Sequence, residues 1–235
     1  MMTSQTFHQF LNTLSKEPLR VIDTTITLDK FVKIDLTENN KDLLNFDVSS
    51  SEDWIKYISS YLKQRVSDVA FGGYLEKRKL YDRSEYFKDL DKNDQRNIHL
   101  GIDLWCNENT KVLAVMDGVI HSFKNNNNYG DYGPTIILKH EIDHQQFYTL
   151  YGHLSISSIN KLIIGTKISR GDTIGYIGDS KVNGDYAPHL HFQIIKDLAD
   201  YIGDYPGVCS KKNIEFFKKN CPDPNLLLKL KNSSI

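Results

Sequence analysis

The stretch TIILKHEIDHQQFYTLYGHL, residues 135–154, decides the fold, because two short apolar runs flank the turn-forming Asp143. Such a pattern predicts an antiparallel hairpin. Short apolar runs separated by Gly and Asp continue on both sides, in KVLAVMDGVIHSF (111–123), GTKISRGDTIGYIGDS (165–180) and HLHFQII (189–195). No helix-length connection lies between successive runs, so they favour an antiparallel sheet over a doubly wound one.

Residues 1–95 follow another pattern, in which helix-like segments alternate with polar stretches. A first helix, ended by Pro18, is predicted from apolar residues at helical spacing: Phe7, Phe10, Leu11 and Leu14. A second is predicted after the capping hydroxyls of Ser50 and Ser51, with its apolar face formed by Trp54, Ile55, Ile58 and Leu62. Between them, residues 23–37 are expected to hold a strand.

The chain therefore divides into three predicted parts. These are a helical and mixed extension (1–95), a strand-rich domain (96–200) and a tail (201–235) with one short helix around Ile214–Lys219, ended before Pro222. The predicted fold class is mainly β, a compact antiparallel sheet with an α-helical N-terminal extension. A chain of 235 residues can bury a sizeable core.

Composition is that of an ordinary globular protein, with 40% hydrophobic and 25% charged residues. The formal net charge of −1 gives no basic field that would attract nucleic acid or anionic lipid, so neither is expected as a partner. No run approaches the ~18 apolar residues that span a bilayer. The start, MMTSQTFHQFLNTLSKEPLR, has no signal-peptide pattern, so a cytoplasmic location is expected by default, with leaderless export or lysis as alternatives. The oligomeric state is not indicated.

The cysteines do not indicate a site. Cys106, Cys209 and Cys221 are widely spaced and include no Cys-x-x-Cys pair, so neither a zinc knuckle nor a disulfide framework is expected. No Gly-x-Ser-x-Gly elbow occurs either, so catalysis by a nucleophilic residue has little support.

Histidines cluster in three patterned segments. In NIHLGIDL (97–104) an extended backbone would place His99, Gly101 and Asp103 on one face, with Gly101 leaving space between two candidate metal ligands. In APHLHFQI (187–194) the face shared by His189, His191 and Gln193 would let one imidazole bind metal while its neighbour addresses the metal's water.

The third segment, YGHLS (151–155), places His153 at the end of a strand. Gly152 beside it is expected to permit close approach of a substrate backbone. Three nitrogen or oxygen ligands with an open fourth position are typical of catalytic zinc. The remaining histidines are assigned surface or structural roles: His8, His121, His140 and His144.

Taken in order, these segments resemble the lysostaphin/LytM-type zinc metallopeptidase family, whose members cleave peptidoglycan peptides. The resemblance runs from about Arg96 to Ile195 and includes HLGIDLWCNENTKVLAVMDGVI, YGPTIILKHE, FYTLYGHLS, GTKISRGDTIGYIGDS and APHLHFQI. It implies a zinc site in a groove across the sheet, held by His99, Asp103 and His191. It also implies that His153 and His189 are the catalytic histidines.

The predicted function is zinc-dependent peptide-bond hydrolysis on peptidoglycan-type or other short peptides containing glycine or D-amino acids. His189 would take the proton of the attacking water and His153 would bond the developing oxyanion, or the roles would be exchanged. Two alternatives are a non-catalytic regulatory module and a cytoplasmic hydrolase of small peptide-like amides. The segment FGGYLEKRKLY (71–81) is expected to cover one end of the groove because of its aromatic and basic residues.

Overall fold

The computed structural model describes residues 4–80 and 94–231. Its helices are α1 (Ser4–Thr13), α2 (Ser51–Gln64), α3 (Ile214–Asn220) and α4 (Asn225–Leu228), with the 3-10 turns η1 (Leu28–Lys30), η2 (Lys41–Leu44), η5 (Ile156–Ser158) and η6 (Lys211–Asn213). Its strands are β1 (Phe31–Lys33), β2 (Val69–Gly72), β3 (Ile98–His99), β4 (Ile102–Trp105), β5 (Lys111–Leu113), β6 (Gly118–Asn126), β7 (Gly133–Ile142), β8 (Gln145–Gly152), β9 (Lys167–Ile168), β10 (Thr173–Tyr176), β11 (His189–Ile195) and β12 (Val208–Cys209). Among these described residues, no helix combines the length and apolar character needed to cross a membrane.

One sheet dominates the described chain, in the order β1-β2-β4-β11-β8-β7-β6-β9, and two small pairs accompany it, β10 with β5 and β12 with β3. The predicted mainly β, antiparallel architecture is confirmed, with one addition at an edge. There β1 and β2 run parallel, because α2 provides the crossover that a parallel pair needs. The sheet is therefore mixed, and its antiparallel centre is β4-β11-β8.

The predicted hairpin is formed by β7 and β8, which pair up to Ile142 opposite Gln145. Asp143 and His144 form the two-residue turn with positive φ angles of 49° and 60°. Two left-handed residues give the turn whose twist matches that of the flanking strands. The long hairpin thus carries β8 to His153 at one end of the sheet.

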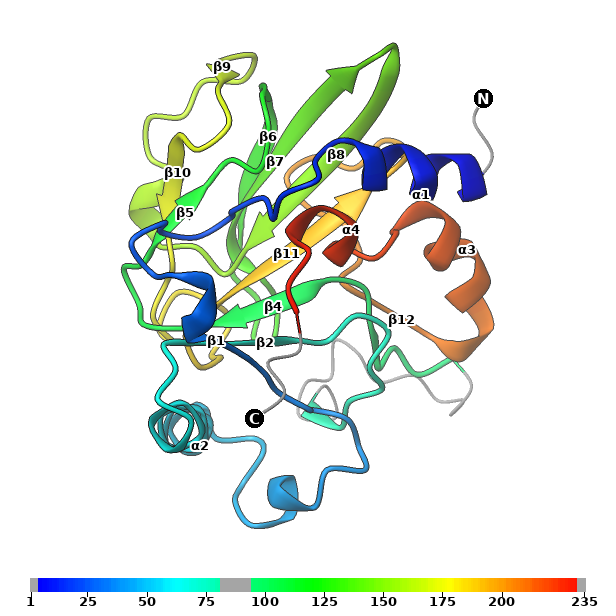
Figure 1. Cartoon of the computed structure of the whole chain (residues 1–235). Coiled ribbons are helices and arrows are strands. Elements are labelled where there is room, and N and C mark those ends of the chain that lie inside the picture. Colours follow the sequence, from blue (N-terminus) through cyan, green and yellow to red (C-terminus); the bar gives the residue numbers. More distant parts are fainter. Residues whose placement is uncertain (1–3, 81–93, 232–235) are drawn as a thin grey trace.

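Both predicted N-terminal helices are present. Phe7 and Leu11 of α1 are buried in the same hydrophobic cluster as Phe147 of β8. The Ser50 side chain caps α2 by accepting a hydrogen bond from the Asp53 amide. In Figure 1, α1, α3 and α4 gather on one side of the sheet, whereas α2 lies apart from them beyond the β1–β2 edge. The predicted division at residue 95 stays a prediction, but hydrophobic packing crosses it.

Candidate metal centre

Antiparallel pairing of β11 with β4 sets two of the predicted ligands against each other, because His191 lies directly opposite Asp103. His99 reaches the same point from the end of β3. All three side chains are buried, with exposed fractions of 2% for His99, 1% for Asp103 and 2% for His191. The structure thus gathers the three residues in the interior, where an unpaired carboxylate would be costly.

The single extended strand expected through residues 97–104 is broken in two. β3 pairs with β12, whereas β4 pairs with β11 and β2. The break lies at Gly101, where an added Cβ would lie 2.6 Å from His191 Cε1. Gly101 does leave space between the ligands, and the His191 imidazole occupies that space.

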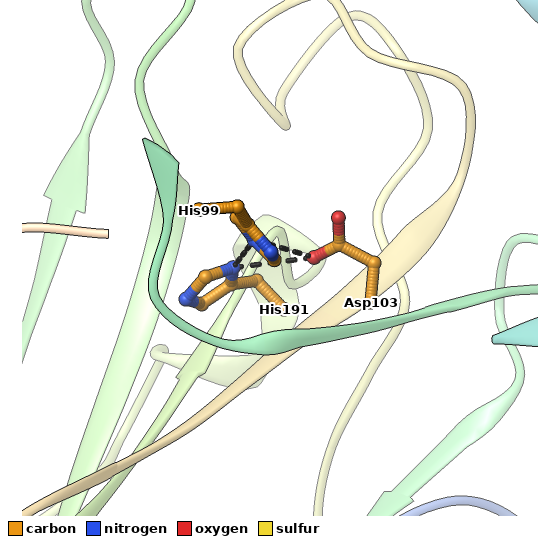
Figure 2. Close-up of side chains that lie close together, drawn as sticks. All are labelled: His99, Asp103 and His191. Carbon is orange, nitrogen blue, oxygen red and sulfur yellow. Dashed lines mark hydrogen bonds and ion pairs between the residues drawn. The ribbon is translucent and has the colours of Figure 1, made fainter. Parts of the chain in front are cut away.

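The ligand atoms converge on one point (Figure 2). His99 Nε2 lies 2.8 Å from His191 Nδ1, and each of these nitrogens lies 3.2 Å from Asp103 Oδ1. A tetrahedral zinc ion with bonds of about 2.0–2.1 Å separates its ligand atoms by about 3.3 Å. The spacing of the three atoms is therefore close to that of a zinc coordination triangle.

Hydrogen bonds on the far side of each ring fix which nitrogen faces this point. His99 Nδ1 donates to the Gly73 carbonyl at 3.0 Å. His191 Nε2 donates to Gln193 Oε1 at 2.9 Å, since the Gln193 amide nitrogen itself donates to the Pro206 carbonyl at 3.1 Å. In the neutral form the two rings therefore present lone pairs, not protons, to each other.

Three acceptors that face one another without a proton repel, and a cation between them removes the repulsion. Burial lowers the pKa of His99 to about 4, so its ring is neutral at ordinary pH. Burial opposes ionisation of Asp103, but the buried Arg78 guanidinium paired with it holds the pKa of this carboxyl well below the ordinary value. Two neutral imidazoles and one carboxylate fit a zinc ion whose fourth position stays open.

The two predicted catalytic histidines adjoin this centre. The His153 and His189 rings lie 4.1 Å apart between centroids, and His189 Nε2 lies 3.9 Å from Asp103 Oδ1. Each ring donates its Nδ1 proton to a carbonyl at 2.8 Å, His153 to Asn183 and His189 to Ala187. Both Nε2 atoms are consequently acceptors in the neutral form.

Burial also sets the protonation of these two rings. It lowers the pKa of His189 to about 4 and that of His153 well below its ordinary value, where the charge of His189 adds to the effect. The negative charge of Asp103 acts in the opposite direction and raises the pKa of both histidines. Both rings are therefore neutral at ordinary pH and can accept a proton, and Asp103 stabilises positive charge on His189.

One expectation about this region is wrong. Gly152 does not face a substrate, because a Cβ there would lie 2.6 Å from Cδ1 of Tyr132. Gly152 instead makes room for the Tyr132 ring, whose hydroxyl lies 3.4 Å from His191 Nε2. The adjacent His153 has a positive φ of 62°, which turns the chain at the end of β8.

Comparison with known proteins agrees with this geometry, since residues 97–202 match the model described as Peptidase family M23. These residues belong to peptidase family M23. The matched M23 segment contains all three candidate ligands and both candidate catalytic histidines.

Two curated relatives are similar to this chain over fewer than a hundred residues each. Glycyl-glycine endopeptidase ALE-1 of Staphylococcus capitis is 33% identical over 95 residues, which are 40% of this chain and 24% of that protein. DD-carboxypeptidase/endopeptidase Mpg of Neisseria meningitidis serogroup B is 33% identical over 96 residues, 41% of this chain and 20% of that protein. The chain thus spans about a quarter or less of the curated relatives it matches. The catalytic domain of lysostaphin from Staphylococcus simulans aligns at 27% identity and a TM-score of 0.36, over 52% of this chain and 80% of that one.

The candidate metal centre opens into a cavity of about 150 Å³. Its walls are rich in aromatic residues, namely Trp105, Tyr132, Tyr186, Tyr201 and Tyr205. Trp105 stacks on the His189 ring at 4.0 Å between centroids. Sequence reasoning missed these walls, because aromatic side chains in separate segments of the chain carry no common spacing.

Arg78 and Leu80 also line the cavity, in agreement with the predicted position of the segment 71–81, of which Tyr81 lies outside the described residues. The other histidines do not line this cavity. His140 is buried and donates from Nδ1 to the Asp117 carbonyl at 2.8 Å, so it has a structural role. All three cysteines are free and buried.

Proposed function

We propose that this chain is a zinc-dependent metalloendopeptidase acting on peptidoglycan-type or other short peptides that contain glycine or D-amino acids. The observation that carries the proposal is the convergence of three unprotonated acceptors, His99 Nε2, Asp103 Oδ1 and His191 Nδ1, beside two neutral imidazoles. The named relatives, a glycyl-glycine endopeptidase and a DD-carboxypeptidase/endopeptidase, support the substrate class.

When bound, zinc would polarise the scissile carbonyl and lower the pKa of water toward ~7. His189 Nε2 accepts a proton from the attacking water, because the nearby Asp103 carboxylate stabilises the imidazolium that forms. The same imidazolium then delivers the proton to the departing amine. The Ala187 carbonyl holds the His189 ring in the required tautomer.

We assign His153 to orienting the water. Its Nδ1 proton is committed to the Asn183 carbonyl, so neutral His153 offers only an acceptor at Nε2. The contact to an oxyanion that the sequence suggested would require a protonated ring, which burial disfavours.

The test is elemental analysis of purified wild type, His99→Ala and His191→Ala, followed by peptide hydrolysis assays. Roughly one zinc per chain in the wild type, lost in both variants, is expected. His144→Asn is the matched control, because His144 is an exposed turn residue and asparagine tolerates its positive φ. The substrates are purified sacculi, glycine peptides and peptides containing D-alanine.

Each outcome separates the proposed activity from its alternatives. Cleavage of cross-linked peptides with zinc bound supports the proposal. Cleavage of small amides alone would favour a small-peptide hydrolase, whose cytoplasmic location also stays a prediction. A folded wild type that binds zinc but cleaves none of these substrates would favour the non-catalytic module.

A further inference from the structure

The second oxygen of the Asp103 carboxylate faces away from the two imidazoles. Oδ1 lies against His99 and His191, whereas Oδ2 accepts a hydrogen bond from Arg78 Nη1 at 2.5 Å. The Arg78 guanidinium is itself held, because its Nε donates to Glu76 Oε2 at 3.0 Å. A Glu76–Arg78–Asp103 chain of charged groups therefore ends at the metal centre.

Arg78 is buried, with an exposed fraction of 2%, so this ion pair is not a solvent-screened surface contact. Its position is fixed by the backbone as well. The Arg78 amide donates to the Asn97 carbonyl and the His99 amide donates to the Glu76 carbonyl, both at 2.9 Å. The segment that carries Arg78 is thus bonded directly to the segment that carries the first candidate ligand.

The same segment also orients His99. Gly73, which follows β2, offers the carbonyl that accepts the His99 Nδ1 proton. Its φ of 118° favours glycine, and a Cβ there would lie 2.2 Å from Arg78 Nη2 and 2.7 Å from His99 Nδ1. Residues 73–78 therefore contact two of the three candidate ligands, although they lie outside the M23 match at 97–202.

We propose that Arg78 is a positioning residue of the metal centre, supported by Glu76, which keeps Asp103 a ligand through Oδ1 alone. This inference rests on the proposed zinc site. The guanidinium at Oδ2 opposes chelation of a cation through both oxygens, because it holds the carboxylate turned with Oδ1 toward the imidazoles and places positive charge beside Oδ2. Coordination through Oδ1 alone leaves the fourth position open for water. The guanidinium also withdraws negative charge from the carboxylate, which leaves a bound cation more electrophilic.

The test compares wild type with Arg78→Met, Arg78→Lys and Glu76→Gln. Zinc affinity is measured by competition with a chromophoric chelator, and the visible spectrum of the cobalt-substituted protein reports the coordination number. Thermal unfolding with metal bound shows whether each variant is folded. Lys77→Met is the matched control, because the neighbouring Lys77 pairs with Glu38 at 3.0 Å, away from the centre.

We expect Arg78→Met to weaken zinc binding roughly 10- to 100-fold, as loss of outer contacts to ligands does elsewhere. Its cobalt spectrum should shift toward five-coordination, and Arg78→Lys should restore part of both effects. Glu76→Gln should show the same changes more weakly, and Lys77→Met neither. Peptide hydrolysis should fall with Arg78→Met even at saturating zinc.

Two results overturn the inference in different ways. Wild-type affinity and an unchanged cobalt spectrum in folded Arg78→Met would remove the positioning role and leave the zinc site intact. If Arg78→Met fails to fold, Arg78→Lys and Glu76→Gln decide by the same two readouts. A wild type that binds no zinc would overturn both this inference and the proposed function.

Discussion

His191 Nδ1 lies 3.2 Å from Asp103 Oδ1, and the two residues face each other directly across the β11–β4 ladder. Cross-strand partners in an antiparallel pair have fixed spacing, so the ladder itself sets this pair of candidate ligands. The third candidate ligand, His99, belongs to β3, which pairs with β12 in a separate two-stranded sheet. The geometry of the centre therefore depends on the chain bend between His99 and Asp103.

Gly101→Ala tests that bend. The added methyl would lie 2.6 Å from His191 Cε1 and 2.7 Å from the Phe192 carbonyl, so the imidazole must move. We expect lost zinc affinity and a free energy of unfolding lower by about 1–3 kcal/mol, the usual cost of overpacking. Gly165→Ala is the control, because its Cβ meets no atom within 4 Å although its φ is 84°. Equal zinc affinity in the two variants would contradict the role given to Gly101.

Gln193→Leu tests how the His191 ring is oriented. Without Gln193 Oε1, the Nε2 proton loses its acceptor and the ring can rotate or change tautomer. Zinc affinity should fall by roughly 10- to 100-fold. Gln146→Leu on the exposed side of β8 should leave affinity unchanged, and chelator competition measures both. A tight zinc site in Gln193→Leu would show that packing alone holds the ring.

His153→Ala and His189→Ala should separate metal binding from turnover. Neither ring is a proposed zinc ligand, so elemental analysis should find zinc in both variants. Turnover should fall by roughly 10²- to 10⁴-fold, the usual contribution of a positioned acid or base. Full activity in both variants, with zinc present, would refute the assignment of these two histidines.

The burial of His140 predicts that the free energy of unfolding depends on pH in a way that does not involve the metal centre. Burial lowers its pKa from 6.5 to about 4 in the folded chain. Between these values the unfolded chain takes up a proton that the folded chain does not, so its contribution is full above about pH 6.5 and is lost as pH falls toward 4. The loss reaches about 3 kcal/mol as an upper bound.

Urea unfolding of wild type and His140→Gln at about pH 7 and about pH 5 measures this contribution. Other buried histidines titrate in both proteins, so the difference between the two pH dependences isolates His140. A variant with the same pH dependence as wild type would mean that His140 is protonated equally in the folded and unfolded chains.

The strand pattern was predictable from sequence because it follows a short period. The candidate metal ligands, which the structure brings together, were predicted from their motifs and from the family resemblance that these motifs carry. Alternation placed His189, His191 and Gln193 on one face of β11, and the contact of Gln193 with His191 agrees with that. Turn chemistry at Asp143 likewise predicted the β7–β8 hairpin.

What sequence could not predict depends on contacts between distant segments. The chain bends at Gly101 because β3 pairs with β12, about a hundred residues further along the chain, whereas β4 pairs with β11. The pairing of Arg78 with Asp103 and the packing of Tyr132 on Gly152 are likewise long-range contacts without local periodicity. Basic and aromatic composition indicated only that residues 71–81 lie near the groove.

Phe7→Ala tests whether the N-terminal helix is part of the same folded unit as the M23 segment. Phe7 is 2% exposed and its ring packs edge-on against Phe147 of β8 at 6.0 Å between centroids. Replacing the Phe7 side chain by alanine should lower the free energy of unfolding by about 3–5 kcal/mol, as for other buried phenylalanines. Phe216→Ala, at a ring 62% exposed, is the matched control and should change it by less than about 0.5 kcal/mol. Zinc release and loss of the sheet in one transition would show that α1 and the metal centre unfold together, whereas a separate early transition would mean that the N-terminal helix folds independently of it.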